Sequence, residues 1–299
     1  MKETLLMKSK TTQRTEMTRA PALAQGRAGL TKPKHLKETA YAKTSGTKEW
    51  AVKTVNCCTG CSHDCRYCFA RSMAVRFRQV APEEWKNERI RWKDVEKTYG
   101  HYDGTVMFPS SHDITPTNFQ ACFTVLKKLL EAGNRLLVVS KPHLECIKKI
   151  CDEMEQYKGQ ILFRFTIGAC DNEILSFWEP NAPRYEERKA ALKYAFEKGY
   201  ETSVSVEPML DSDHIDDLVS DLLPFVTDAI WIGTMNHLHR IEIDDEAVER
   251  AIRNIQAGQT EDRIKAIYER LKGNHKIKWK AEIKKIVGLP QVEKPGMDK

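Results

Sequence analysis

Residues 61–68 read Cys-Ser-His-Asp-Cys-Arg-Tyr-Cys, so three cysteines lie within one short stretch, separated by three and then two residues. Cysteine thiolates are the usual ligands of iron–sulfur clusters, and a cubane [4Fe–4S] cluster normally takes four of them. A loop that supplies only three leaves one iron free to bind another molecule. The spacing therefore predicts a metal centre whose protein ligands are Cys61, Cys65 and Cys68.

Cys58 leaves two other interpretations open. With Cys58 included, the four cysteines form two C-x2-C pairs that could hold zinc. Structural zinc sites usually separate such pairs by about a dozen residues or more, and only three lie between these two. Cys58 could instead complete a structural or electron-transfer cluster. A ferredoxin run, with a further cysteine ahead of proline, is absent, and a disulfide framework is typical of small secreted domains.

The loop resembles that of radical S-adenosylmethionine (SAM) enzymes, including an aromatic residue, Tyr67, directly before the third cysteine. The resemblance implies a [4Fe–4S] cluster whose open iron binds the amino and carboxylate groups of SAM, with Tyr67 beside the cofactor. It also implies a reductant such as flavodoxin or ferredoxin. One electron from the cluster would cleave SAM to a 5′-deoxyadenosyl radical, which abstracts hydrogen from a substrate.

Outward from this loop, short apolar runs alternate with helical patterns. Such alternation is typical of βαβ units that build a parallel sheet. The expected strands are 50–56, 105–108, 135–140, 161–167, 202–206 and 229–232. The expected helices are 70–77, 82–99, 117–133, 143–157, 184–198 and 213–223. The fold class is therefore α/β, and six units match the partial parallel (β/α)6 barrel of the family that the loop resembles.

The same patterns divide the chain into four parts. Residues 1–46 form a basic arm without apolar periodicity, and the barrel spans 47–243. Residues 244–288 add two or three helices around a short strand at 277–279, and 289–299 form a tail. The arm is expected to be disordered because it offers little apolar surface to bury.

Polar residues follow most of the predicted strands, where parallel barrels place their ligands. They include Ser110, Ser111 and Asp113 after the second strand, Lys141 after the third, Thr166 at the fourth and Glu207 after the fifth. With Tyr67, these are the predicted cofactor-binding residues. Lys141 suits the methionyl carboxylate of SAM, and Thr166 suits a ribose hydroxyl. Ser110, Ser111 and Asp113 suit the amino group and the ribose.

Two strand ends resemble the spore photoproduct lyase-like branch of the family: Ser-Lys at 140–141 and Arg-Phe-Thr-Ile at 164–167. The resemblance places Lys141 at the SAM carboxylate and Thr166 at the ribose. This branch has a hydrogen-donating cysteine near the end of the second strand, where this chain has Ser-Ser-His-Asp. Photoproduct repair itself is therefore not expected. Cys122 falls with the apolar period of a helix, and Cys170, after the fourth strand, is the one catalytic candidate.

Charge is concentrated at the N-terminus. Residues 1–48 hold eleven Lys and Arg against three Asp and Glu, a net of +8, whereas the whole chain carries +6. Two interpretations of such an arm stay open, an electrostatic contact with nucleic acid and a solubilising extension. Together with the branch resemblance, the arm favours a nucleic-acid or nucleotide substrate. The alternatives are a peptide or small metabolite, or a nucleic-acid-binding protein with a structural metal site. Without an apolar run long enough to span a bilayer, we expect a cytoplasmic enzyme.

Overall fold

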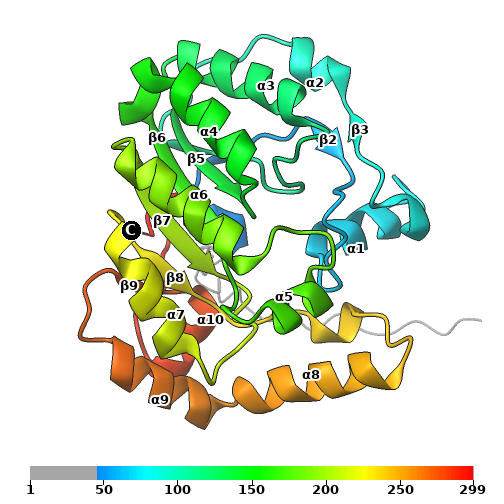
Figure 1. The fold of residues 1–299 in the computed structure, drawn as a ribbon, viewed down its shortest axis with the longest axis vertical. Coiled ribbons are helices and arrows are strands. Elements are labelled where there is room, and N and C mark those ends of the chain that lie inside the picture. The colour runs from blue at the N-terminus through cyan, green and yellow to red at the C-terminus, as the bar shows by residue number, and fades with distance from the viewer. Residues whose placement is uncertain (1–45, 299) are drawn as a thin grey trace, which may run out of the picture. The chain divides into compact units, whose positions relative to one another are not determined.

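The computed structural model describes residues 46–298, so the predicted arm lies outside the described residues except for Gly46. Seven strands form one parallel sheet in the order β1-β4-β5-β6-β7-β8-β9 (Figure 1). Their bounds are β1 Lys53–Thr54, β4 Thr105–Phe108, β5 Arg135–Ser140, β6 Ile161–Thr166, β7 Glu201–Val206, β8 Ile230–Ile232 and β9 Ile277–Trp279. A second sheet pairs β2 (Cys58–Thr59) with β3 (Arg89–Ile90).

The α/β fold with a parallel sheet is confirmed, and the short strand expected at 277–279 joins the six barrel strands as the seventh strand of the sheet. β9 pairs with β8 through Ile230 and Ile277, so residues 244–288 supply a strand of the sheet as well as helices. The α-helices are α1 Phe69–Arg76, α2 Trp92–Glu96, α3 Phe119–Glu131, α4 Leu144–Glu153, α5 Asn172–Trp178, α6 Tyr185–Glu197, α7 Ile215–Leu222, α8 Glu246–Gly258, α9 Glu261–Leu271 and α10 Ala281–Val287. Short 3-10 helices are Gly46–Glu49, Pro82–Glu84, Glu155–Gln160, Leu223–Phe225 and Leu238–Arg240.

Two predicted elements differ from the structure. The strand expected at 50–56 is regular only over β1, although Val52 and Val55 still donate backbone hydrogen bonds to β4. The helix expected at 82–99 is instead a 3-10 turn, β3 and the short α2. Its middle is extended because β3 pairs with β2, and because Arg91 donates from its guanidinium to the carbonyls of Asn56 and Cys58. Long-range pairing here overrides the local helical pattern.

The barrel interior is filled by side chains rather than open. Trp50 and Trp231 meet edge to face with ring centroids 5.4 Å apart, next to Met107 and Leu137. The Arg164 guanidinium lies 4.5 Å from the Trp50 ring and 5.1 Å from that of Trp231. Arg164 begins the strand end 164–167 that resembles the lyase-like branch, and in the structure its side chain packs with these aromatic rings. We call this group of interior side chains the plug. The plug forms the floor beneath the carboxyl ends of the strands.

The segment before β1 packs against the C-terminal part of the chain. Gly296 and Asp298 donate backbone hydrogen bonds to the carbonyls of Lys48 and Glu49. The Lys280 ammonium, which follows β9, lies 2.9 Å from a carboxylate oxygen of Glu49, and both side chains are almost fully buried. This contact joins residues far apart in the sequence and fixes the segment that leads into β1.

Candidate active site

The cysteine loop is held between β2 and α1. Cys68 caps α1, and its sulfur accepts from the backbone N–H of Arg71 at 3.3 Å. The Cys61 N–H donates to the carbonyl of Trp85. Gly60 adopts φ +92°, and a side chain there would come within 2.6 Å of the carbonyl oxygens of Trp85 and Asn87. Only glycine fits this approach, so the loop geometry depends on a residue outside the motif.

One cavity of about 340 Å³ opens at the carboxyl ends of the strands. It brings together every predicted metal- and cofactor-binding residue: Cys61, Cys65, Cys68, Tyr67, Ser110, Ser111, Asp113, Lys141, Thr166 and Glu207. The remaining wall is largely apolar and includes Trp50, Met107, Val139 and Met235. Their convergence follows from the parallel sheet, because its strands all end at the same edge. Their roles as ligands remain predictions.

The three cysteines fit a metal cluster by their chemistry and placement. Cys61 and Cys65 are 6 % and 5 % exposed, and Cys68 is half-buried at the cavity wall. Burial raises the pKa of all three thiols. Metal ligation requires the thiolate form. A cationic metal centre bound among them would supply the positive charge that stabilises three buried thiolates.

Their spacing argues against a single zinc ion. Two thiolates on one zinc are at most about 4.6 Å apart, because each Zn–S bond is about 2.3 Å. The three loop sulfur atoms do not form such a group, since the two groups of three potential ligands within 4.8 Å in residues 46–298 are Cys57, His112 and Cys122, and Cys61, His63 and Asp113. Cys58 does not line the cavity, and its thiol faces the carbonyls of Thr59 and Gly60.

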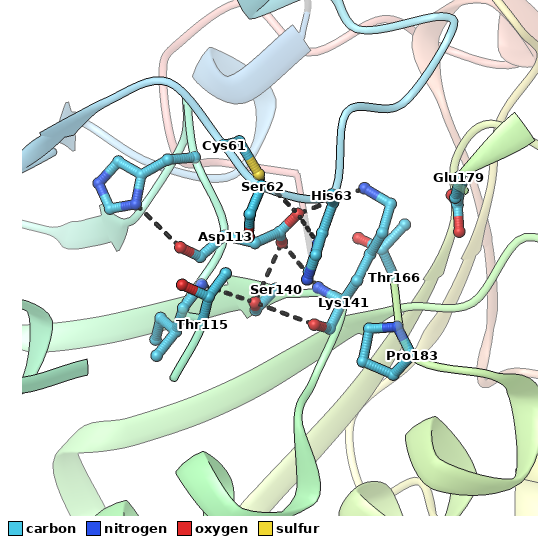
Figure 2. Close-up of polar contacts among 12 residues, drawn as sticks. Cys61, Ser62, His63, Asp113, Thr115, Ser140, Lys141, Thr166, Glu179 and Pro183 are labelled. Atoms are coloured by element: carbon cyan, nitrogen blue, oxygen red, sulfur yellow. Dashed lines mark hydrogen bonds and ion pairs between the residues drawn. The ribbon is translucent and has the colours of Figure 1, made fainter. Parts of the chain in front are cut away.

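Asp113 is the hub of a buried network, which we call the Asp113 cluster: Asp113, Lys141, His63 and Ser140 (Figure 2). One carboxylate oxygen accepts from the Ser140 hydroxyl at 3.0 Å and from the Lys141 N–H at 2.7 Å. The other lies 2.9 Å from Nδ1 of His63 and 3.6 Å from the Lys141 ammonium. The thiol of Cys61 points at this second oxygen, 3.8 Å away.

The two charges of this cluster stabilise each other. Burial alone would raise the pKa of Asp113, but Lys141 and His63 outweigh it and hold that pKa well below its usual range. Burial would lower the pKa of Lys141, but Asp113 raises it well above its usual range. Asp113 is therefore a carboxylate and Lys141 an ammonium at neutral pH. The ammonium lies beside the loop cysteines and above the Tyr67 ring, 5.7 Å from its centroid.

A second buried network holds Tyr67. Its hydroxyl donates to Glu179, and Glu179 is 2.5 Å from the guanidinium of Arg188. Arg188 also donates to the carbonyls of Thr166 at 3.3 Å and Pro183 at 2.7 Å. Glu179 and Arg188 are fully enclosed. The network thereby ties the cysteine loop to the end of β6, and the sequence pattern gave no sign of it.

Two further groups support the loop. Glu88 accepts from the N–H and hydroxyl of Ser62 and from the hydroxyl of Thr115. Asn56 accepts from the N–H groups of Ser110 and Ser111 and donates to the Ser110 hydroxyl. Ser110 thus has a protein partner in addition to any bound ligand. The sequence pattern singled out neither Glu88, which lies outside the motif and the strand ends, nor Asn56, which ends the strand expected at 50–56.

Cys170 is not among the residues that line this cavity. It packs against the main hydrophobic core and is only partly buried. Cys57 and Cys122 are both fully buried, with their sulfur atoms 3.7 Å apart, so the expected core position of Cys122 agrees with the structure. None of these three cysteines lines the cavity in which the predicted cofactor-binding residues meet.

A sequence profile of the radical SAM superfamily matches residues 55–223, more than half of the chain. The chain belongs to the radical SAM superfamily. This membership was predicted from the loop. The family implies SAM and an iron–sulfur cluster as cofactors, and it typically needs a reductant. No helix in residues 46–298 is long and apolar enough to cross a membrane.

Two uncharacterized proteins are similar in sequence. ORF301 of Acidianus two-tailed virus is 26 % identical over 197 residues, which cover 62 % of this chain and 64 % of ORF301. MJ0683 of Methanocaldococcus jannaschii is 23 % identical over 181 residues, covering 58 % of this chain and 67 % of that protein. The chain thus spans a little under two thirds of ORF301. Neither relative supplies a substrate.

Among solved structures, the fold is similar to a spore photoproduct lyase mutant with dinucleoside spore photoproduct. The TM-score is 0.52 at 15 % identity, covering 81 % of this chain and 79 % of the lyase. A further structure of a spore photoproduct lyase mutant gives a TM-score of 0.51 at 15 % identity, with the same coverage. At this identity the likeness shows the fold alone.

Proposed function

We propose that this enzyme holds a [4Fe–4S] cluster on Cys61, Cys65 and Cys68, cleaves SAM reductively, and abstracts hydrogen from a nucleic-acid or nucleotide substrate. One observation carries the proposal: two buried thiols, the half-buried thiol of Cys68 and a buried ammonium line the same cavity. When bound, the cluster supplies the electron that breaks a carbon–sulfur bond of SAM. No zinc-binding or purely structural role requires Lys141 at that place.

The chain's own residues would bind and orient the cofactor. The Lys141 ammonium can donate to the SAM carboxylate, while Asp113 keeps it charged and fixes its position. The hydroxyls of Ser111 and Thr166 can donate to the amino acid or ribose oxygens at the cavity wall. Apolar residues such as Met107 and Val139 exclude water, which protects a reactive carbon from side reactions.

The test is anaerobic reconstitution with iron and sulfide, followed by SAM and dithionite. We expect the formation of 5′-deoxyadenosine, measured by chromatography, and none without dithionite. A reconstituted cluster that is reduced but yields no 5′-deoxyadenosine would contradict the proposal and favour a structural cluster. Metal analysis on the same sample separates this outcome from failed cluster assembly.

The nucleic-acid substrate rests on the basic arm and on the strand ends that resemble the lyase-like branch. Deleting residues 1–45 keeps Gly46, whose carbonyl accepts from Lys280. The truncated protein should keep its cluster and its substrate-free SAM cleavage. Its affinity for an oligonucleotide should fall, and the slope of log K against log salt should become shallower, because fewer counterions are released.

The matched control replaces the ten Lys and Arg of residues 1–45 by Gln, which preserves the length of the segment. It should behave like the deletion if charge is the cause. If the complete chain shows no salt-sensitive oligonucleotide binding near physiological salt, the nucleic-acid substrate is wrong. The preference then moves to a peptide or a small metabolite.

A further inference from the structure

Residues 70–93, which we call the cap segment, cover the outer side of the cysteine loop. Ala74, Val80 and Trp85 of this segment form a small buried core with Cys61, and Cys68 packs against it. The Trp85 carbonyl also accepts from the N–H of Cys61 at 2.9 Å. In Figure 1 the segment runs from α1 through β3 to the start of α2, in cyan, beside β2. It therefore lies between the cluster ligands and solvent.

The outer face of the cap segment is basic. Its exposed cations are Arg76, Arg78, Lys86, Arg89 and Lys93, against two exposed anions, Glu83 and Glu84. None of the five cations forms an ion pair within residues 46–298. Such an excess of positive charge is unusual in this part of the chain, because residues 49–299, which include the cap segment, hold 37 Lys and Arg against 39 Asp and Glu. Unpaired positive charge thus gathers over the cluster ligands.

Two large apolar side chains are exposed on the same segment. Phe77 is 62 % exposed and Trp92 is 60 % exposed, more than any other Phe, Tyr or Trp in the described part of the chain. Arg76 lies 6.0 Å from the centroid of the Phe77 ring. Aromatic and Arg side chains are enriched in protein–protein interfaces, where they supply most of the binding energy. The segment thus combines positive charge with apolar anchors.

We propose that the cap segment is the docking surface for an acidic one-electron carrier protein, such as a flavodoxin, that reduces the cluster. This inference rests on the proposed function. On docking, the carrier is oxidised by one electron and the cluster is reduced by one electron, with no atom or proton transferred. The outer residues of the segment, from Arg76 to Arg78 and from Lys86 to Lys93, do not line the cavity. A substrate bound there could not reach the cofactor, whereas an electron can pass through the intervening protein.

The test measures the binding of an acidic flavodoxin to the reconstituted enzyme by calorimetry, at low and at physiological salt. The variant combines Arg78→Glu, Lys86→Glu and Lys93→Glu. The control combines Lys193→Glu, Lys265→Glu and Lys285→Glu, which reverse the same number of exposed charges on α6, α9 and α10. We expect affinity to fall about tenfold or more in the cap variant, and less than about twofold in the control, because interface charges steer association. Added salt should weaken wild-type binding most.

A second measurement separates docking from chemistry. Dithionite is a small reductant and needs no docking surface, so SAM cleavage with dithionite should be equal in the cap variant and the wild type. Cleavage driven by reduced flavodoxin should slow in the cap variant alone. If wild-type enzyme gives no 5′-deoxyadenosine with dithionite, the proposed function fails, and the binding titration still decides whether the surface docks a carrier.

Three results would overturn the inference. The first is that wild-type enzyme binds neither an acidic flavodoxin nor an acidic ferredoxin. The second is that the cap variant and the control variant bind flavodoxin equally well. The third is that the cap variant loses affinity for an oligonucleotide and keeps its affinity for flavodoxin. That result would make the segment a nucleic-acid contact. Circular dichroism melts of both variants show whether a loss of flavodoxin affinity is caused by misfolding. The single variant Arg78→Glu tests the surface with a smaller change.

Discussion

Two buried charges lie near the carboxyl ends of the strands, and their surroundings differ. Asp113 accepts from residues of the cysteine loop and the end of β5, and part of its side chain faces the cavity. Lys280 follows β9, is fully enclosed, and lies 2.9 Å from Glu49 and 3.5 Å from Glu207. We call Lys280, Glu49 and Glu207 the Lys280 cluster. The Asp113 cluster keeps an ammonium, Lys141, available to a ligand, whereas the Lys280 cluster joins the segment before β1 to the C-terminal part of the chain.

This difference shows that burial of a charge does not by itself mark a functional site. A buried ion pair offsets its desolvation only through good geometry and additional hydrogen bonds, and removing one partner leaves an uncompensated charge. Both clusters meet this requirement. Only the Asp113 cluster combines it with open space and the thiols of the cysteine loop, and this combination distinguishes the proposed active site. Glu207 belongs to both regions, since it lines the cavity and contacts Lys280.

The largest expected effect separates the loop cysteines from their neighbours. Replacing Cys61, Cys65 or Cys68 by Ala should abolish the visible iron–sulfur absorbance or leave a degraded cluster, because each thiolate is an obligatory ligand. Cys57→Ala and Cys58→Ala are the controls and should keep a reducible cluster. A Cys58→Ala variant that lacks the cluster as completely as the loop variants would instead support a four-cysteine structural site.

Removing the charge of Lys280 should damage the fold rather than the active site. Lys280→Met leaves Glu49 buried without its partner, which should lower the free energy of unfolding by about 3–5 kcal/mol. Urea unfolding followed by circular dichroism measures this loss. Lys278→Met, on β9 two residues earlier, is the control and should change stability little. Wild-type stability in Lys280→Met would show that the contact does not join the two ends of the chain.

Removing the charge of Lys141 should affect cofactor binding rather than the fold. Lys141→Ala should weaken SAM binding by about 1.5–3 kcal/mol, because it removes a charge-assisted hydrogen bond to a carboxylate. Equilibrium binding of SAM to the reconstituted enzyme measures the effect, and iron content should stay constant. Lys149→Ala, an exposed lysine on α4, serves as the control. Unchanged affinity for SAM would mean that Lys141 does not contact the cofactor.

The smallest effect is a pH dependence next to the Lys280 cluster. Burial, and then the charge of Glu207, raise the pKa of Glu282 to about 7 from its ordinary value of 4.5. The folded protein therefore binds this proton more tightly than the unfolded chain, so the contribution of Glu282 to stability falls as pH rises from about 4.5 to 7. Glu282→Gln keeps an oxygen that can accept from the Thr234 N–H.

Thermal melts at pH 5 and pH 8 test this prediction. The difference in melting temperature between the two pH values should be smaller in Glu282→Gln than in the wild type. An equal difference in both proteins would assign the pH dependence to other groups. The corresponding Glu261→Gln variant, exposed on α9, should leave the difference unchanged.

The sequence by itself determined the features that depend on short range or on simple periodicity. Three thiols within eight residues predicted the cofactor chemistry, because the spacing of ligands within one loop can be counted from the sequence. Alternating strands and helices identified the parallel sheet, and the edge at which parallel strands end is common to all of them. This is why residues as distant as Tyr67 and Glu207 were correctly expected at one cavity.

Only the tertiary structure decided which distant groups pair. Tyr67 meets Glu179, and Lys280 meets Glu49, across 112 and 231 residues of chain. No periodicity records such pairings, since each depends on how whole elements pack. The same reason explains β3, whose pairing with β2 replaced an expected helix, and Cys170, which follows a strand end and yet lies outside the cavity. Local pattern sets the elements and the edge where they meet, and the free energy of burying charges in pairs sets the partners.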